Sequence, residues 1–302
     1  VDVERGTRGN RNKFTKSTEK LFVPPYYREY FTHTDLDWYD RLFSGRTESA
    51  SLDPITFAEW ISEVGDKLMA LRDLIDRAYE KQCSEVLETG IVNLVNGDNI
   101  DFKRLPASMV DLGAGNYWSE AINPIPSVIA GCEFLRTKGK YGGGTFNLIA
   151  GSDAIEALIN NSDFQNRADI RRYDLALINE PQRNSTGGVL QGRFVAGAYT
   201  INLWGYPEFY DNDAGESVRY WPSNKVVILP EVTQFVFGFG GVPTLMSTGD
   251  STLPQGIFPT KGQYVFGDYI DDRNMTHEFD VRSAGIAIPT AVDQIYTIQV
   301  LA

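Results

Sequence analysis

Residues 53–90 read DPITFAEWISEVGDKLMALRDLIDRAYEKQCSEVLETG and carry the clearest structural signal in the chain. Asp53 can cap a helix, Pro54 suits its first position, and Gly90 can end it. We therefore predict one amphipathic helix about 50 Å long, at about 1.5 Å per residue, with Gly65 as the position of any bend. Its apolar residues recur at three- and four-residue steps: Phe57, Trp60, Ile61, Val64, Leu68, Leu71, Leu74, Ile75, Ala78, Val86 and Leu87.

The segments after this helix change from helical to strand patterns. Residues 91–102 alternate apolar and polar side chains around Asn96-Gly97, which predicts a β-hairpin with a tight turn. A helix is predicted at 122–135, a buried strand at 145–150, and a short helix at 153–159 capped by Ser152. Because helices come early and strands late, the sequence predicts an α+β fold rather than a doubly wound parallel sheet. The late strands are predicted at 194–203, 225–229, 233–239, 264–268, 277–287 and 294–300.

The composition is that of a globular protein. The chain has 302 residues, of which 42% are hydrophobic and 23% charged, so it can bury a large core in one or two domains. Its two cysteines, Cys83 and Cys132, are too few for a disulfide framework or a four-cysteine zinc site, and we predict buried free thiols. No apolar run approaches the roughly 18–20 residues needed to cross a bilayer, and no signal-peptide pattern opens the chain, which favours a soluble, unexported protein.

Charge is distributed unevenly along the chain. Six basic and three acidic residues give residues 1–20 a net charge of +3. Because the whole chain carries −12, the remaining residues carry −15. An acidic protein of this kind is disfavoured as one that coats nucleic acid by neutralising phosphates. The basic segment is either a solvated tail or an arm that lies on an acidic neighbour. The chain begins with Val rather than Met, as it would after proteolytic removal of an upstream segment or if numbering began at an ordered fragment.

Residues 1–52 show no regular periodicity but are rich in aromatic side chains. Such a segment cannot form a core by itself, so it packs either on the body of its own chain or on a neighbouring subunit, and the pattern leaves both open. A dense aromatic stretch within it comprises Tyr26, Tyr27, Tyr30, Phe31, Trp38, Tyr39 and Phe43.

A search for catalytic or metal-binding motifs finds little. The only histidines are His33 and His277, which are predicted to be exposed and offer little for a metal site or a Ser-His-Asp triad. The glycine clusters at 142–144 and 238–241 lack the spacing of phosphate-binding loops and are predicted to be turns. The acidic pairs at 271–272 and at 211 and 213 lack the array of a calcium loop. We therefore predict no catalytic, cofactor or metal site.

Four segments carry a further signal through their order along the chain. The first is the helix exit SEVLETG at 84–90 followed by the hairpin at 91–102, and the second is NYWS at 116–119 before an apolar helix. The third is FNLIAG at 146–151 before a small helix, and the fourth is VRSAGIAIP at 281–289. In this order they resemble the lambda-type phage capsid protein E family, and the resemblance covers residue 56 to the C-terminus. In the fourth segment Pro289 is kept, but Gly285 stands where another proline is typical of the family.

This resemblance implies the Hong Kong 97-like capsid fold, in which an N-terminal arm and extended loop precede a spine helix and the peripheral and axial domains. The implied division is 1–53 for the N-terminal arm and extended loop, and 54–111 for the spine helix and peripheral domain. Residues 112–222 would form the axial domain, and 223–302 would return to the peripheral domain.

The resemblance also implies a function without catalysis. It indicates a major capsid protein of a tailed phage, assembled in the host cytoplasm as hexamers and pentamers of an icosahedral-type head around double-stranded DNA. The implied partners are the chain itself, a portal, and scaffold or cement proteins, with no cofactor, no membrane and no sequence-specific DNA binding. Arm residues would contact adjacent subunits, and the residues expected in these contacts are Arg5, Arg8, Arg11, Tyr26, Tyr27, Tyr30 and Trp38.

Two other functions remain open from the sequence. A bacterial nanocompartment shell of the encapsulin type would use the same fold to enclose an enzyme. A soluble glycan-acting enzyme would use paired carboxylates and would be monomeric, whereas either shell protein would form closed particles or rings.

Overall fold

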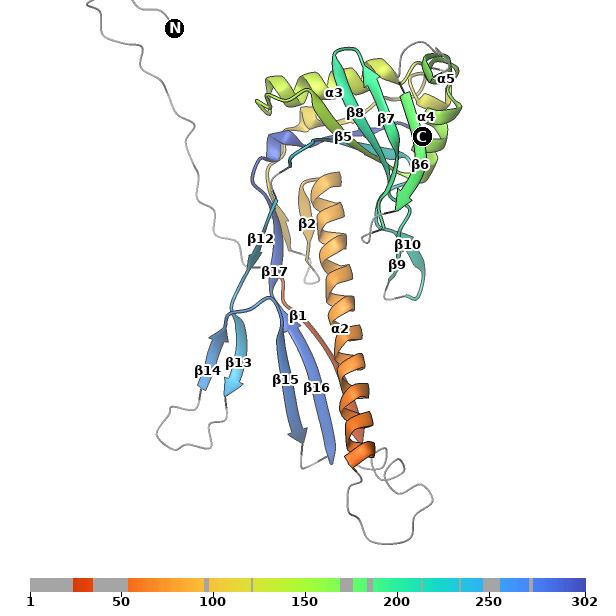
Figure 1. Cartoon of the computed structure of the whole chain (residues 1–302). Coiled ribbons are helices and arrows are strands. Elements are labelled where there is room, and N and C mark those ends of the chain that lie inside the picture. The colour runs from red at the N-terminus through yellow and green to blue at the C-terminus, as the bar shows by residue number, and fades with distance from the viewer. Residues whose placement is uncertain are drawn as a thin grey trace, which may run out of the picture.

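The computed structural model describes residues 24–34, 54–94, 98–120, 122–168, 176–183, 187–212, 214–233, 235–246, 256–271 and 274–302. Within them the molecule is elongated and has two parts (Figure 1). A long helix with strands beside it forms a stem, and a larger sheet with shorter helices forms an upper lobe at one end of that helix. The mixture of helices and strands confirms the predicted α+β class.

The predicted long helix is confirmed as α2 (Pro54–Glu88), which is helical through Gly65. Gly90 ends it with a φ of 74°, a left-handed conformation that suits glycine. The Gly90 amide donates to the carbonyls of Glu85 and Val86 at 3.3 and 3.0 Å. A Cβ at residue 90 would lie 2.5 Å from Cδ of Arg104, so the site also lacks room for a side chain. No helix of the described residues is long and apolar enough to span a membrane.

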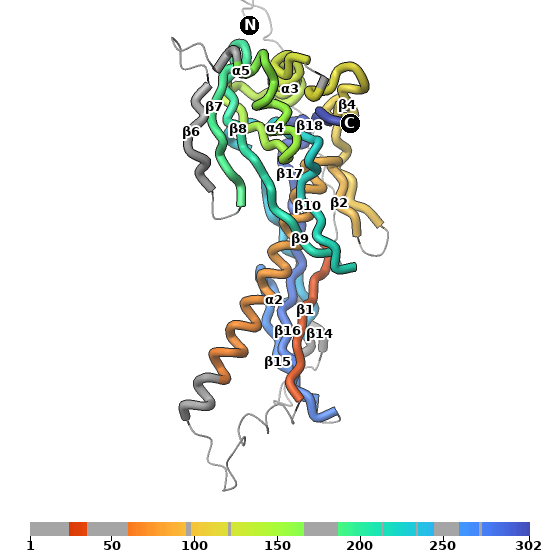
Figure 2. Tube along the Cα trace, turned by 90° about the vertical axis from the view of Figure 1, so that its right-hand side faces the viewer, coloured from red at the N-terminus to blue at the C-terminus, as the bar shows by residue number. Residues whose placement is uncertain are grey.

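Three antiparallel strands run along α2 in both views (Figure 1, Figure 2). They are β1 (Tyr27–Thr34), β16 (Thr276–Ser283) and β15 (Val265–Asp271), in the order β1-β16-β15. We expected no regular element before residue 53, so β1 is a correction. Its pairing with β16, from Tyr27 opposite Ser283 to Thr34 opposite Thr276, joins parts of the chain about 250 residues apart, which local periodicity cannot reveal.

Aromatic side chains fill the space between this sheet and α2. Phe31 stacks on Phe279 with ring centroids 5.3 Å apart, and Tyr27 meets Tyr79 of α2 edge to face at 5.5 Å. His33 lies on the same face of β1 and is buried, which contradicts the prediction that it is exposed. The described part of the aromatic segment thus packs on its own chain.

The upper lobe is built on a mixed seven-stranded sheet with the order β4-β18-β11-β5-β8-β7-β6. The β18–β4 and β5–β8 pairs are parallel and the others antiparallel. Helices α3 (Ile125–Thr137), α4 (Ser152–Asn160) and α5 (Ser162–Ala168) belong to the same lobe (Figure 1). The strands are β4 (Met109–Asp111), β5 (Thr145–Ala150), β6 (Ala176–Arg183), β7 (Val189–Ala196), β8 (Tyr199–Gly205), β11 (Lys225–Pro230) and β18 (Tyr296–Gln299).

The largest hydrophobic core of the described residues lies in this lobe. Phe146 and Leu148 of β5, Ile201 of β8 and Ile228 of β11 are fully buried in it, and so is Leu135 of α3. Along β5 and β8 the buried side chains alternate with partly exposed ones, the arrangement expected when helices cover a sheet face, whereas β11 is buried along almost its whole length.

Smaller elements join or extend the two parts. Four two-stranded pairs are formed by β2 (Ile91–Asn93) with β3 (Asn99–Asp101), β9 (Phe209–Asp211) with β10 (Ser217–Arg219), β12 (Phe235–Phe239) with β17 (Gly285–Pro289), and β13 (Val242–Met246) with β14 (Gly256–Thr260). Three short 3-10 helices lie at η1 (Pro106–Ser108), η2 (Trp118–Glu120) and η3 (Val292–Gln294). The β2–β3 pair confirms the predicted hairpin, although Asn96 and Gly97 lie outside the described residues.

Three local predictions are wrong in detail. The strand predicted at 194–203 is two strands, β7 and β8, separated by a turn in which Gly197 has a φ of 62°. The strand predicted at 277–287 is likewise divided into β16 and β17 at Ala284. Gly151, not Ser152, is the N-cap of α4, and the Ser152 hydroxyl bonds Asp153 instead. The two strand errors concern points where the chain reverses or changes partner within a continuing strand pattern.

The sheet of the upper lobe takes strands from three of the four segments into which the sequence was divided. β5 to β8 come from 112–222, β11 and β18 from 223–302, and β4 from 54–111. The last segment therefore contributes to both the upper lobe and the stem. The four-part domain division itself stays a prediction.

Candidate assembly surfaces

A buried carboxylate fastens β1 to the stem. Asp280 of β16 is fully buried, and it accepts hydrogen bonds from Nε of Arg28 at 2.7 Å and Nε of Arg282 at 3.1 Å. Arg28 also pairs with Glu278, and its bond to Asp280 raises its pKa above the ordinary value. Gly267 of β15 lies opposite Asp280, where a Cβ would overlap the carboxylate. Glycine at this position thus allows two arginines to share one buried acid.

Gln82 joins α2, β1 and β17 through one buried side chain. Its Nε2 donates to the hydroxyl of Tyr27 at 2.6 Å and to the carbonyl of Gly285 at 3.4 Å. Its Oε1 accepts from the amide of Ala287 at 3.4 Å. The side-chain amide therefore bonds the edge of β17 as a neighbouring strand would, which satisfies backbone groups that α2 would otherwise leave buried and unpaired.

Arg104 joins the end of α2 to the upper lobe. Its Nη1 donates to the carbonyls of Leu87 and Glu88 at 2.7 and 3.2 Å, where the helix leaves carbonyls without helical partners. Burial lowers the pKa of Arg104 to about 10, so the guanidinium is charged at neutral pH and suits the negative end of the helix. Its Nη2 donates to Ser108 O, Ile295 O and Thr297 Oγ1 at 3.1, 3.3 and 3.1 Å.

The predicted contact residues fall into two groups. Tyr26 and Tyr30 are 46% and 58% exposed, and Tyr30 lies on the face of β1 that points away from α2. Tyr27 points towards α2, and Gln82 and Tyr79 take up its side chain. The remaining predicted residues lie outside the described part of the chain: Arg5, Arg8, Arg11 and Trp38.

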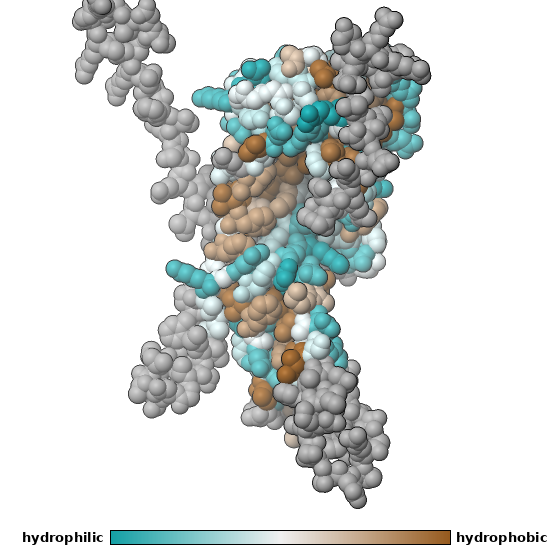
Figure 3. All heavy atoms as spheres, in the orientation of Figure 1, coloured by the Kyte–Doolittle hydropathy of each residue, from teal (hydrophilic) through white to brown (hydrophobic). Residues whose placement is uncertain are grey.

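Large apolar side chains remain exposed along the stem. Figure 3 shows apolar surface on one face of the molecule between the upper lobe and the middle of the stem. Within the described residues, the outer edges of β12 and β15 pair with no other strand, so apolar side chains accompany unpaired backbone there. The exposed residues are Ile61, Met69 and Leu74 on α2, Val236, Phe237 and Phe239 on β12, and Phe266 and Ile270 on β15.

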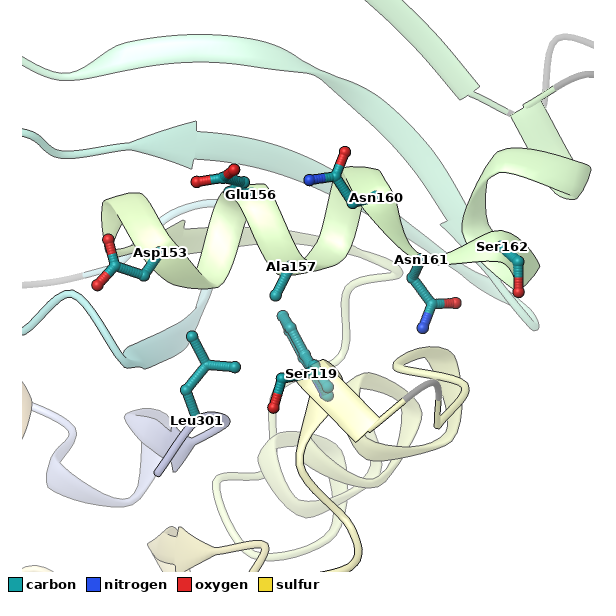
Figure 4. Close-up of a pocket in the computed structure, with 9 residues that line it drawn as sticks. Ser119, Asp153, Glu156, Ala157, Asn160, Asn161, Ser162 and Leu301 are labelled. Carbon is teal, nitrogen blue, oxygen red and sulfur yellow. The ribbon is translucent and has the colours of Figure 1, made fainter.

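A pocket of about 540 Å³ opens on the upper lobe between α4, η2 and the last residues of the chain (Figure 4). Trp118, Ala157 and Leu301 give it an apolar lining. Asp153 and Glu156 add two carboxylates from successive turns of α4, and Figure 4 shows Ser119 and Leu301 across from them. Hydrogen bonds from Ser223 and Ser152 hold the pKa of Asp153 below its usual value, which keeps that carboxylate charged.

The described residues contain no group of three or more His, Cys, Asp or Glu side chains that could hold a metal ion. Cys132 is a buried free thiol, as predicted, whereas Cys83 is only half-buried. Burial raises the pKa of Cys83 to about 11 and that of Cys132 to about 12, so neither thiol is an activated nucleophile.

Sequence reasoning missed the three polar residues that hold the parts together. Gln82 lies between Tyr79 and Val86 on the apolar face of α2. A polar residue at this position was the one sequence signal that could have indicated a buried hydrogen-bonding side chain. Asp280 and Arg104 carried no such signal, because alternating charge in a strand is typical of a solvated face and a lone arginine is typical of a surface loop.

Solved structures similar to this chain include phage capsid proteins and an encapsulin. A prophage protein of E. coli CFT073, described as a capsid protein, superposes with a TM-score of 0.65 at 13% identity, over 92% of this chain and 77% of that one. The bacteriophage PhiM1 mature capsid gives a TM-score of 0.44 at 12% identity, over 99% and 79%. The SrpI encapsulin of Synechococcus elongatus PCC 7942 gives 0.41 at 12%, over 93% and 75%. No curated protein matches.

The superposition on the prophage protein therefore defines the class of fold, which is the Hong Kong 97-like capsid fold, as the sequence resemblance implied. Residues 3–298 match the sequence profile described as phage major capsid protein E, which covers nearly the whole chain. The chain belongs to the phage major capsid protein E family. It is a structural component of the virion capsid shell, it associates with copies of itself, and its family is not a family of enzymes.

Proposed function

We propose that copies of this chain associate as hexamers and pentamers that close into a head around double-stranded DNA. The observation that carries the proposal is the unused surface of the stem, where apolar side chains and unpaired strand edges occur together within the described residues. A monomer that exposes both would be prone to associate, and covering them with neighbouring copies removes apolar area from water at about 25 cal/mol per Å².

The shell encloses DNA without reading its sequence. A total charge of −12 supports this, because a protein that gripped phosphates over a large surface would carry the opposite sign. A portal and scaffold or cement proteins are the other proposed partners. The chain itself has no enzymatic role in this proposal, and neither a cofactor nor a membrane takes part.

The N-terminal segment contributes contacts between subunits. Tyr26 and Tyr30, in the described part of this segment, are exposed and therefore available to a neighbour. Arg5, Arg8 and Arg11 provide positive charge for an acidic neighbouring surface. Replacing the three arginines with alanine is expected to lower assembly yield and particle stability, more at low than at moderate salt. Unchanged yield and stability at both salt concentrations would refute this contact.

Negative-stain microscopy and sedimentation of the purified full chain test the proposal as a whole. Closed shells, or rings of five and six subunits, are the expected result. A stable monomer at high concentration would refute it. Closed particles that recruit a co-expressed enzyme and exclude DNA would instead indicate a nanocompartment shell.

A further inference from the structure

The upper lobe carries a basic loop and an acidic pocket at separate places. The loop follows α3 and carries Lys138 and Lys140, and Arg136 lies beside it in the last turn of α3; all three side chains are exposed. The pocket is lined by Asp153 and Glu156 of α4 together with apolar side chains, and Figure 4 shows Glu156 on the opposite side of α4 from Leu301. Strand β5 runs from the loop to the start of α4, so its six residues separate the two features by about 20 Å at about 3.3 Å per residue.

Both features keep their charges available. Among the described residues, neither Lys138 nor Lys140 has an ion pair, and neither Asp153 nor Glu156 has one. Arg136 lies over the ring of Tyr199 at 5.7 Å, which still leaves its charge at the surface. Two sets of unpaired, opposite charges on one chain cannot meet each other across the length of β5, but they can meet on two copies.

The basic loop is held in place rather than left free to adapt. The amide of Lys138 donates to the carbonyl of Phe134 at 2.8 Å, and the amide of Tyr141 donates to that of Leu135 at 3.1 Å. Nε2 of Gln294 also donates to the carbonyl of Gly139 at 2.9 Å. A loop fixed in this way presents its lysines without paying a large ordering entropy on association.

The pocket suits the end of a lysine or arginine side chain. Trp118, Ala157 and Leu301 can cover the methylene stem of such a side chain, while the exposed carboxylates of Asp153 and Glu156 at the edge of the pocket can meet its charged end. The bonds that hold the pKa of Asp153 down also keep that carboxylate ionised. Among the described residues, Arg219 is the cation that acts on Asp153, and it lies over the ring of Phe209 at 4.6 Å.

We propose that the acidic pocket of one subunit binds the basic loop, Lys138 and Lys140 foremost, of the next subunit in a capsomer ring. The inference rests on the proposed function and adds which surfaces meet. The contact joins two different surfaces of the same chain, and a head-to-tail contact of this kind closes into a ring when its rotation permits. Charge complementarity would then set the direction of the ring as well as stabilise it.

Charge reversal on each surface tests the contact. The variant K138E/K140E makes the loop acidic, and D153N/E156K makes the pocket basic while leaving an amide oxygen for Ser152 and Ser223 to bond. Each variant alone would place like charges together, and we expect each to lower the assembled fraction at least about tenfold. The charge-conserving control K138R/K140R, in which the same backbone positions are changed, is expected to assemble as the wild type does.

Mixing the two reversed variants gives a sharper result. The basic loop of one then meets the acidic pocket of the other, and the acidic loop meets the basic pocket, so subunits alternate around the ring. Alternation requires an even number of subunits. Native mass spectrometry of the mixture is therefore expected to recover six-membered rings and no five-membered rings, and one chain carrying all four changes is expected to recover both.

Each outcome decides the proposal. Reversed variants that stay folded by circular dichroism and assemble within twofold of the wild type would overturn it. So would a mixture that stays unassembled while both variants are folded. If D153N/E156K blocks assembly and K138E/K140E does not, the pocket binds a cation other than the basic loop, which also overturns the proposal. Loss of assembly in R5A/R8A/R11A would then identify the N-terminal segment as that partner. A wild-type chain that stays monomeric would refute the proposed function, and this contact with it.

Discussion

Arg104 is the residue whose removal tests the joint between the long helix and the upper lobe. We consider Arg104→Met, which has a similar length and no hydrogen-bond donor. The substitution removes donors from the carbonyls of Leu87 and Glu88 at the end of α2, and from those of Ser108 and Ile295. The carbonyl of Leu87 keeps a bond from the hydroxyl of Thr297 at 2.7 Å, so it is not left bare.

The expected loss follows from what remains buried. A buried carbonyl without a donor costs about 1–3 kcal/mol, and the removed guanidinium no longer has to be desolvated, which offsets part of the sum. We therefore expect Arg104→Met to lower the free energy of unfolding by about 3–5 kcal/mol. Arg104→Lys keeps the charge but loses the planar fork that reaches both the helix and β18, and it should cost about 1–3 kcal/mol.

Lys103 offers a matched control in the next position. Its side chain is 72% exposed and pairs only with Asp101 among the described residues. Lys103→Met should therefore change the free energy of unfolding by less than about 1 kcal/mol. Urea unfolding of the full chain, followed by tryptophan fluorescence below its assembly concentration, measures all three variants. An Arg104→Met midpoint equal to that of Lys103→Met would refute the idea that Arg104 holds the joint.

Three further predictions concern the stem and the thiols. Gly267→Ala forces a methyl group against the carboxylate of Asp280 and should destabilise the protein by about 2 kcal/mol or more. Gly65→Ala adds a methyl group that meets nothing within 4 Å and should stabilise the protein by about 0.5–1 kcal/mol. Equal urea midpoints for the two variants would contradict both predictions. Gln82→Leu leaves the carbonyl of Gly285 and the amide of Ala287 in β17 without their hydrogen bonds and should lower the free energy of unfolding by about 1–3 kcal/mol. Faster proteolysis near β1 should accompany the loss. Unchanged stability would count against this role of Gln82. Because burial raises the pKa of the thiols to about 11 and about 12, against 9.0 unfolded, the native state retains protons that the unfolded state loses. The free energy of unfolding should therefore fall as pH rises above 9. Alkylation of the two thiols at pH 8 should be far slower in the native chain than in urea. Rapid alkylation of the native thiols would contradict their burial.

The parts of the fold that sequence predicted are those fixed by neighbours along the chain. The three- and four-residue spacing of apolar residues, with Pro54 and Gly90 at its ends, defined α2 almost to the residue. The strand at 145–150 was predicted with its observed bounds, because it is short, apolar and preceded by glycines. Where an apolar run continued through a reversal at Gly197, the same reasoning merged two strands into one.

The candidate surfaces were less accessible to sequence reasoning. In the sequence Tyr26, Tyr27 and Tyr30 are equivalent aromatic residues of one irregular segment, but their positions beside and on β1 give them different surroundings. Tyr27 faces α2, while Tyr26 and Tyr30 are exposed. The sequence also did not predict the basic loop and the acidic pocket as contact surfaces, because no sequence pattern shows that the two lie at opposite ends of β5.

The sequence by itself determined the long helix, the α+β class, the absence of a recognisable catalytic motif and the resemblance to a capsid family. These depend on short-range periodicity and on motifs read in order. Only the tertiary structure decided that β1 pairs with β16, that Asp280 lies between two arginines, and that Arg104 holds the end of α2 to β18. The Arg28–Asp280 and Arg104–Thr297 contacts join residues 252 and 193 positions apart, and their energy comes from burial and hydrogen bonding that exist only once the chain has folded.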